Sequence, residues 1–335
     1  MSGRRRIAVL RALPGLGDFL CAVPALRALR RLEPCAEVVL VGLARQLGLV
    51  RRYPALVDRL VELPCWPGLP EQPLDPAALP PFLAEMQERR LDLALQLHGS
   101  GGQTNALALL LGARETLGFH PADGWRPAAT GFLPWVEEEP EPLRWLRLLR
   151  QLGPVEDDGA LAFPVTDADR AELGALPGAA RLAGRPYAVL HPGASTPARW
   201  ADPVRAAGLA DALAALGLAV GLTGSAGEAD LVVRVRGAMR ASGMAVPLAG
   251  ATDLGPLAAL LAGARVVVCG DTGVSHLAVA VGAPSVVLFG AASPVRWGPL
   301  DRRRHRVLPA DAPVGRVLAE CAALTAPGVA LARSG

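Results

Sequence analysis

The sequence contains no lysine, and all 34 of its basic residues are arginine. Because this bias runs along the whole chain, it indicates GC-rich coding rather than a local functional demand. Aromatic residues make up only 4% of a chain that is 51% hydrophobic, so its cores must consist mainly of Ala, Val and Leu. At roughly 150 residues per domain, the length predicts two domains.

Cysteine is also scarce, and none of it is arranged for cross-linking. The chain has five cysteines: Cys21, Cys35, Cys65, Cys269 and Cys321. None belongs to a C-x-x-C pair, and the number is odd. This pattern argues against a disulfide framework and against a zinc site. We therefore expect no bound metal and a reducing, cytoplasmic environment.

Long charged or apolar segments are missing too. The net charge is +3, and the clusters Arg4–Arg6 and Arg302–Arg304 are too short and too poor in aromatic neighbours to predict nucleic-acid binding. Arg11 and Asp18 interrupt the apolar start of the chain, which argues against a signal peptide. The uncharged run Leu277–Val295 is broken by Gly and Pro, so it predicts a helix, a turn and a buried strand rather than a membrane span.

What is present is an alternation of apolar strands with Ala- and Leu-rich helices. The expected strands are Ile7–Leu10, Val38–Val41, Leu93–Leu97, Tyr187–Leu190, Ala219–Thr223, Val266–Cys269 and Ser285–Phe289. The expected helices are Ala22–Leu32, Thr104–Leu111, Pro203–Ala215 and Leu254–Ala262. This order predicts an α/β protein with doubly wound sheets, whose ligands bind at the carboxyl ends of the strands. Pro, Gly and acidic residues gather between the two strand groups, which places the boundary within 153–185 and the domains at 1–165 and 166–335.

The first glycine-rich turn, Leu13–Asp18, follows the first expected strand. It is not a G-x-G-x-x-G dinucleotide fingerprint, because position 20 is Leu and no acidic residue follows Val38–Val41 at the required place. The turn presents one carboxylate, Asp18, at the mouth of the sheet. From the local pattern alone, a helix N-cap is the simpler interpretation of Asp18.

Two similar loops follow strands of the second half. His191–Ser195, with Arg199 downstream, combines a glycine, a hydroxyl and a cation that suit a phosphate. A capped structural role for the histidine is an equal alternative. Thr223–Glu228 offers small residues and the Glu228 carboxylate, which suit a ribose or a base edge; taken alone, an ordinary βα turn is the simpler interpretation.

The most specific pattern is Cys269–His276. It joins an expected buried strand to a helix expected to begin near Ser275, so the backbone N–H groups of Thr272 and Gly273 lie at a helix N-terminus. That end carries about half a positive charge and suits a diphosphate. Asp271 can accept hydrogen bonds from sugar hydroxyls, and His276 lies one turn into the same helix.

Taken in order, these segments resemble the ADP-heptose:lipopolysaccharide heptosyltransferase family, glycosyltransferase family 9. The segments that carry the resemblance are Leu16–Asp18 with Pro24–Leu26, Asp92–Gly101, His191–Ala194, Thr223–Ser225 with Glu228, and Asp271–Gly273 with His276. Each motif alone is weak. Their order and spacing, from residue 6 to residue 300, make the resemblance specific.

The resemblance implies a GT-B fold, in which two Rossmann-like domains face each other across a cleft. It implies an inverting, metal-independent transfer with the acceptor on the N-terminal domain and the nucleotide sugar on the C-terminal one. Asp18 then becomes the expected general base, which reverses the N-cap interpretation. Residues implied to surround the nucleotide diphosphate and ribose are Ser195, Glu228, Thr272, Gly273 and His276. Asp271 is implied to face the donor sugar, and Arg199 to bind phosphate where the family commonly has Lys.

By the same resemblance, the donor is expected to be ADP-heptose, no other cofactor is needed, and the acceptor is a glycan or glycolipid such as lipopolysaccharide core. At most peripheral contact with the inner membrane is expected, and no nucleic-acid partner. Three alternatives stay open: another GT-B nucleotide-sugar enzyme with a non-heptose donor, a nicotinamide-dependent Rossmann dehydrogenase, and a catalytically silent sugar-nucleotide-binding protein.

Overall fold

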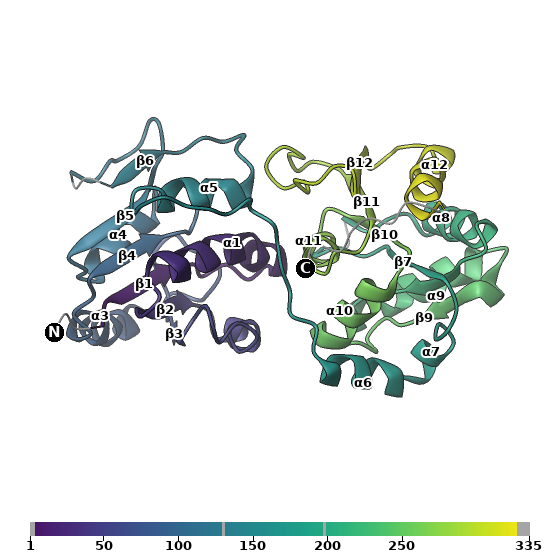
Figure 1. Cartoon of the computed structure of the whole chain (residues 1–335), viewed down its shortest axis with the longest axis horizontal. Coiled ribbons are helices and arrows are strands. Elements are labelled where there is room, and N and C mark those ends of the chain that lie inside the picture. The colour runs from purple at the N-terminus through teal and green to yellow at the C-terminus, as the bar shows by residue number, and fades with distance from the viewer. Residues whose placement is uncertain (1–3, 129–130, 197–198, 327–335) are drawn as a thin grey trace. The chain divides into compact units, whose positions relative to one another are not determined.

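The computed structural model describes residues 4–128, 131–196 and 199–326. The chain divides into two compact units, Met1–Ala160 and Leu161–Gly335, where the sequence placed the boundary at 165/166. Each unit contains one six-stranded parallel sheet with helices on its faces (Figure 1).

The N-terminal sheet has the strand order β3-β2-β1-β4-β5-β6. Its strands are β1 (Arg6–Leu10), β2 (Glu37–Gly42), β3 (Arg59–Glu62), β4 (Leu93–Gln96), β5 (Glu115–His120) and β6 (Phe132–Pro134). The central strands β1 and β4 pair in register from Ile7 opposite Leu93 to Leu10 opposite Gln96. Both are buried on both faces, as expected for a parallel sheet between two helical layers.

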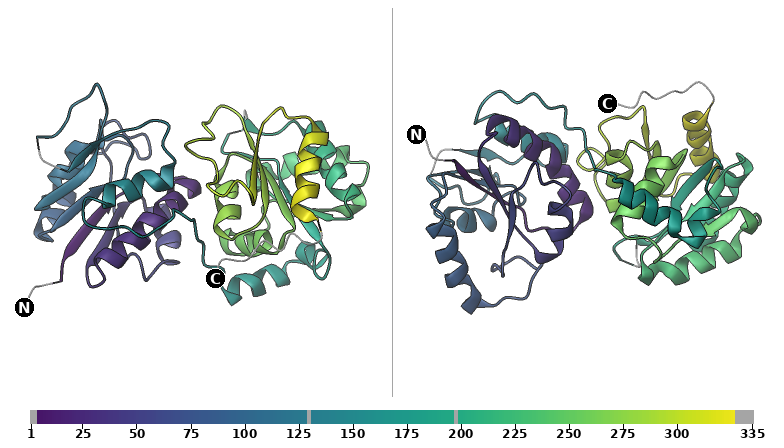
Figure 2. Two further views of the ribbon diagram at one scale, coloured as in Figure 1. Left: turned by 45° about the horizontal axis from the view of Figure 1, so that its top comes forward. Right: turned by 60° about the horizontal axis from the view of Figure 1, so that its bottom comes forward.

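The helices of this unit are α1 (Leu16–Leu32), α2 (Leu47–Val50), α3 (Leu79–Glu88), α4 (Thr104–Leu110) and α5 (Glu141–Leu149). α3 and α4 cover the sheet face that Ala8 and Leu10 present, where Met86 and Leu107 are completely buried. α1 and α5 pack against each other, and Figure 2 shows them on the opposite face.

The C-terminal sheet has the order β12-β11-β10-β7-β8-β9. Its strands are β7 (Tyr187–His191), β8 (Ala219–Leu222), β9 (Ala245–Pro247), β10 (Val266–Gly270), β11 (Ser285–Phe289) and β12 (His305–Pro309). β7 pairs with β10 in parallel, from Ala188 opposite Val266 to His191 opposite Cys269.

The C-terminal helices are α6 (Asp167–Ala175), α7 (Pro177–Ala180), α8 (Pro203–Ala215), α9 (Ala229–Ala238), α10 (Leu254–Gly263), α11 (Gly273–Ala280) and α12 (Val314–Thr325). α8, α9 and α12 share one core with the strands, built from Ala, Val and Leu as the composition predicted. α6 packs on α10. Two doubly wound units in one chain confirm the α/β class and the GT-B fold that the resemblance implied.

The strand orders locate the ligand-binding edge of each unit. In the N-terminal sheet the chain reverses its direction of winding between β1 and β4, and in the C-terminal sheet between β7 and β10. Loops on either side of such a switch point diverge, which opens a crevice at the carboxyl ends of the two strands. The loops that carry Asp18, Ser195 and Asp271 all leave a strand at one of these two places.

Two expectations about helices are settled by the structure. The run Leu277–Val295 forms the end of α11, a turn and β11, as predicted, and no helix in the described ranges has the length and apolar character to cross a membrane. The first helix, expected from Ala22, begins at Leu16, so the N-cap interpretation of Asp18 is wrong: Gly15 holds that position. Gly and Asp are poor helix formers, but burial of Phe19 against the core extends the helix through them.

Candidate active site

Asp18 lies in the first turn of α1, directly after the turn that leaves β1. Its side chain is 26% exposed, so it is accessible at the carboxyl edge of the sheet. A Cβ at position 15 would overlap Asp18 Oδ2, so glycine there lets the carboxylate keep this position. The carboxylate therefore occupies the space that a side chain at position 15 would fill.

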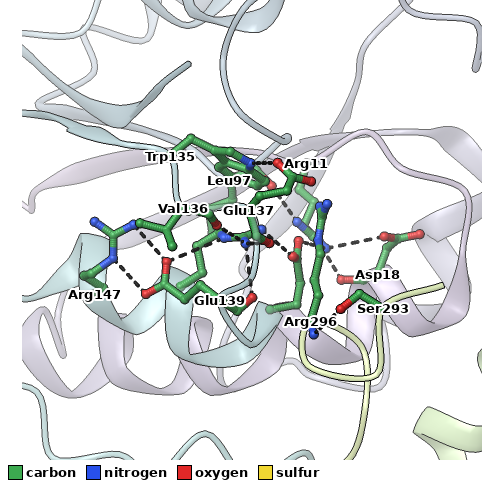
Figure 3. A network of polar contacts seen from close by, with 12 residues as sticks. Arg11, Asp18, Leu97, Trp135, Val136, Glu137, Glu139, Arg147, Ser293 and Arg296 are labelled. Carbon is green, nitrogen blue, oxygen red and sulfur yellow. Dashed lines mark hydrogen bonds and ion pairs between the residues drawn. The ribbon is translucent and has the colours of Figure 1, made fainter. Parts of the chain in front are cut away.

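Arg11 directly follows β1 and contacts the Asp18 turn (Figure 3). Its side chain is 1% exposed, and its Nε atom donates a hydrogen bond to the main-chain carbonyl of Asp18 at 2.8 Å. Its Nη2 atom lies 3.8 Å from Asp18 Oδ1. The candidate base is thus fixed through both its main chain and its carboxylate by one buried cation.

His98 is a second polar group at this switch point, just after β4. Its Nδ1 atom accepts a hydrogen bond from the main-chain N–H of Ala12 at 3.1 Å. Burial lowers the pKa of His98 to about 4, and the charge of Arg11 adds to the lowering. The imidazole is therefore neutral at pH 7, with its proton on Nε2. The sequence placed His98 in a family motif but did not single it out; its position directly after a central strand was the available signal.

In the C-terminal unit, Arg199 connects the loops that follow β7 and β10. Its Nη2 atom donates to the main-chain carbonyl of Asp271 at 2.7 Å and lies 3.7 Å from Asp271 Oδ2. Its Nη1 atom lies 3.4 Å from Ser195 Oγ. Three of the predicted donor residues therefore contact one another across the switch point. The Arg199 side chain is 50% exposed, which leaves its guanidinium accessible to a ligand.

The N-terminus of α11 opens at the same place. Thr272 holds the N-cap position but makes no capping hydrogen bond, and its buried hydroxyl has no hydrogen-bond partner in the described part of the chain. Ser275 donates to the Thr272 carbonyl through both its main-chain N–H and its hydroxyl. The N–H groups of Gly273 and Val274 come in the first turn, where an α-helix supplies no acceptor. The helix therefore presents donors and its positive dipole end to the switch point.

Glu228 approaches this site from the neighbouring strand β8. It ends a 3₁₀ turn, Ala226–Glu228, and its Oε2 atom accepts a hydrogen bond from the Ser225 N–H at 2.6 Å. A Cβ on Gly193, in the loop after β7, would overlap Glu228 Oε1. Glycine at 193 thus lets the carboxylate lie against the loop backbone.

Two histidines lie beside these groups in a neutral form. Burial lowers the pKa of His276 to about 4, and its ring contacts Trp297 edge-on, with centroids 6.2 Å apart. Burial also lowers the pKa of His191, against the opposing effect of Glu228, and its Nδ1 atom lies 3.1 Å from Thr223 Oγ1. This contact supports the structural interpretation of His191.

The remaining titratable groups of the site limit its chemistry. Burial raises the pKa of Asp271, with Arg199 acting in the opposite direction. Burial raises the pKa of the Cys269 thiol to about 12, and Asp271 adds to the rise, so this cysteine is not a thiolate nucleophile. Within 4–128, 131–196 and 199–326, no three His, Cys, Asp or Glu side chains are grouped so as to hold a metal ion.

The structure therefore brings the predicted donor residues together within one unit and places Asp18 in the other. Ser195, Arg199 and Asp271 contact one another, Thr272, Gly273 and His276 lie at the start of α11, and Glu228 lies beside Gly193. Arg11, His98 and Trp297 were not predicted. Arg11 and Trp297 carry no local motif, because their importance comes from contacts with residues distant in the sequence.

Comparisons with known proteins assign the chain to a family. The family model described as glycosyltransferase family 9 (heptosyltransferase) matches residues 88–317. No curated protein matches the chain by sequence. The matched segment covers more than half of the chain, which is enough to assign the chain to this family.

Solved structures share the fold. A glycosyl transferase family 9 protein from Veillonella parvula is similar with a TM-score of 0.79 and 20% identity, over 97% of this chain and 98% of that chain. The E. coli ADP-heptose lipopolysaccharide heptosyltransferase II is similar with a TM-score of 0.73 and 21% identity, over 96% and 98%. The E. coli heptosyltransferase WaaC with ADP is similar with a TM-score of 0.65 and 20% identity, over 94% of this chain and 95% of that chain. The chain is thus a glycosyltransferase that belongs to glycosyltransferase family 9, the heptosyltransferase family.

Proposed function

We propose that this enzyme transfers heptose from ADP-heptose to a hydroxyl group of a glycan or glycolipid such as lipopolysaccharide core, with inversion and without a metal ion. The observation that carries the proposal is the joining of Arg199, Asp271 and the α11 N-terminus at one switch point. A cation beside the first-turn N–H groups of a helix is suited to a diphosphate. Family relatives support the donor: WaaC from E. coli has structures with ADP and with ADP-2-deoxy-2-fluoro heptose.

At the donor, the bond between the anomeric carbon and the diphosphate oxygen breaks, and its electron pair goes to the diphosphate. The N–H groups of Gly273 and Val274 and the Arg199 guanidinium stabilise that charge. These donors are held in place before the reaction, so they need little reorganisation as the charge develops. Asp271 accepts hydrogen bonds from sugar hydroxyls, and Glu228 accepts from the ribose.

At the acceptor, Asp18 takes the hydroxyl proton as the oxygen forms its bond to the anomeric carbon. Attack on the face opposite the departing diphosphate inverts the anomeric configuration. Neutral His98, with a proton on Nε2, can donate a hydrogen bond to an acceptor oxygen beside Asp18. The helix terminus and Arg199 supply the positive charge that a metal ion supplies in other nucleotide-sugar enzymes.

A panel of nucleotide sugars tests the proposal. The enzyme is incubated with ADP-heptose, ADP-glucose, UDP-glucose or GDP-mannose and a lipopolysaccharide-core acceptor, and released nucleotide is measured with and without EDTA. We expect fastest release from ADP-heptose and no effect of EDTA. Faster turnover of a hexose donor would reassign the substrate, and loss of activity in EDTA that Mg²⁺ restores would contradict the metal-independent mechanism.

Gly193→Ala provides a second test, aimed at Glu228. The added methyl group must displace the Glu228 carboxylate from its hydrogen bond with Ser225. The displaced carboxylate would lose its proposed hydrogen bond with the ribose, and a hydrogen bond to a charged group is worth about 1.5–3 kcal/mol. We therefore expect the affinity for ADP, measured by isothermal titration calorimetry, to fall roughly 10-fold. Gly227→Ala is the matched control, since a Cβ there meets only Ser225 Oγ, at 3.8 Å. Equal affinity of the two variants would remove Glu228 from the nucleotide site.

A further inference from the structure

A chain of buried charges extends from Asp18 into the core of the N-terminal unit (Figure 3). Asp18 contacts Arg11, Arg11 contacts Glu141, and Glu141 contacts Arg144. Arg11, Glu141 and Arg144 are 1%, 2% and 0% exposed, so Asp18 is the member that reaches solvent. Burying three charged groups is costly, and nothing in packing a sheet against a helix requires it.

Arg11 connects the two loops of the switch point. Its Nε atom donates to the Asp18 carbonyl at 2.8 Å, and its Nη1 atom donates to the Leu97 carbonyl at 2.5 Å. It therefore links the start of α1 to the end of β4 through main-chain atoms. Its guanidinium also lies over the Trp145 ring, 4.9 Å from the centroid, which fixes its plane.

The third guanidinium nitrogen of Arg11 lies between two carboxylates. Nη2 is 3.8 Å from Asp18 Oδ1 and 4.0 Å from Glu141 Oε1, and it makes no hydrogen bond within the described residues. Its positive charge therefore lies almost equally close to the exposed carboxylate of Asp18 and to the buried carboxylate of Glu141.

Glu141 is fixed from its other side. Its Oε2 atom accepts a hydrogen bond from Arg144 Nη1 at 2.7 Å. Arg144 Nη2 donates to the carbonyls of Val136, Glu137 and Glu139, and its guanidinium lies over the Trp135 ring at 3.6 Å. The start of α5 therefore holds Glu141 rigidly at its distance from Arg11.

We propose that Arg11 is a positioning residue for the candidate base Asp18, and that Glu141 determines how strongly the Arg11 charge acts on the Asp18 carboxylate. The inference rests on the proposed role of Asp18 as the base. Arg11 orients the Asp18 turn and keeps the carboxylate ionised. Glu141 offsets part of that charge, so that Asp18 stays basic enough to accept a proton.

The other charged groups of the unit around Arg11 fit this division of roles. His98, just after β4, is neutral at pH 7. Arg144 on α5 contacts Glu141 rather than Asp18. Removing the Arg11 charge and removing the Glu141 charge should therefore change the proton affinity of Asp18 in opposite directions.

The test compares Arg11→Met, Arg11→Lys and Glu141→Gln by their pH profiles of kcat. Because a misplacement of about 1 Å can cost ~100-fold, we expect Arg11→Met to lower kcat by about that factor, and Arg11→Lys to recover part of it. The acid limb of the kcat profile, where activity falls as Asp18 takes up a proton, should move to higher pH in Arg11→Met. A carboxylate without its neighbouring cation binds a proton more readily. The acid limb should move to lower pH in Glu141→Gln. Donor KM should be unchanged in all three.

Arg147→Met is the matched control. Arg147 lies on the same helix, pairs with Glu139 at 2.8 Å and covers the Phe119 ring. Glu139 Oε2 lies 3.7 Å from Arg144 Nε, so Arg147 is two contacts further along the network from Asp18 than Arg144 is. Arg147→Met should lower the melting temperature without moving the acid limb. Wild-type kcat and acid limb in Arg11→Lys and Glu141→Gln, while Asp18→Asn is inactive, would overturn this inference alone. Full activity of Asp18→Asn would overturn the proposed base itself. If Arg11→Met fails to fold, the position of the acid limb in the kcat profile of Glu141→Gln still tests the inference.

Discussion

Asp18→Asn is expected to lower kcat by about 10²–10⁴-fold, the contribution typical of a general base, while the affinity for ADP stays the same. The amide keeps the size of the carboxylate and can still lie above Gly15, but it cannot take a proton from the acceptor hydroxyl. The donor residues belong to the other unit of the chain, so they are untouched. The measurement pairs transfer kinetics at saturating donor with calorimetric titration of ADP.

Asp167→Asn controls for the loss of one negative charge. Asp167 lies at the start of α6 with a fully exposed side chain, and it pairs with Arg170 on the surface. This variant should transfer at the wild-type rate, because surface ion pairs contribute little. An Asp18→Asn enzyme with wild-type kcat would refute the base role, and a matching loss of ADP affinity would indicate a structural role instead.

Acidification is the second change with a large expected effect, because burial in the folded chain disfavours the protonated form of four histidines. Burial lowers the pKa of His98, His276 and His305 to about 4, from a usual value of 6.5. For His98 the Arg11 charge adds to this lowering. Burial also lowers the pKa of His191. Four of the five histidines in the chain are buried in this way.

The direction of the effect follows from proton binding. Between pH 6.5 and 4 the unfolded chain binds protons at these histidines and the folded chain does not, so stability is complete above pH 6.5 and is lost as the pH falls. At ~1.4 kcal/mol per unit of pKa shift, each of His98, His276 and His305 lowers the free energy of unfolding by on the order of 3 kcal/mol when the pH falls to 4. Their sum is comparable with the ~5–15 kcal/mol that stabilises a typical domain.

Urea denaturation at pH 7, 6 and 5 measures this effect as the free energy of unfolding. We expect it to fall steeply below pH 6. In the His305→Asn variant the fall should be shallower, because Asn does not titrate and its oxygen can accept from Ser285 Oγ, which lies 2.9 Å from His305 Nδ1 in the wild type. A free energy of unfolding that does not change between pH 7 and 5 would show that these rings take up protons over the same pH range in the folded and unfolded chains, and would contradict the lowered pKa values.

The sequence predicted the central strands better than the edges of the sheets. β1, β4, β7 and β10 are continuous apolar runs, because both faces of a parallel strand are buried. The edge strands β3, β6, β9 and β12 were missed, and so was β5, which lies next to the edge strand β6. They are short or mixed in polarity; β3, for example, reads Arg-Leu-Val-Glu, with one fully buried residue. Such segments become strands through pairing with a neighbour, which local sequence does not record.

The same reasoning explains what was found of the site and what was missed. Asp271–Gly273 was predictable, since its function comes from a strand end, a glycine and a helix start that are adjacent in the sequence. The pairing of Arg199 with Asp271 joins residues 72 positions apart. Arg11 and Glu141 lie still further apart, and Glu141 opens α5. Their roles depend on the packing of α5, which no local pattern specifies.

A crystal structure of the enzyme with ADP bound tests the central claim most directly. The account predicts diphosphate oxygens within hydrogen-bonding distance of the Gly273 and Val274 N–H groups and of the Arg199 guanidinium, with the ribose at Glu228. A diphosphate bound instead at the turn Leu13–Asp18 of the N-terminal unit would contradict it.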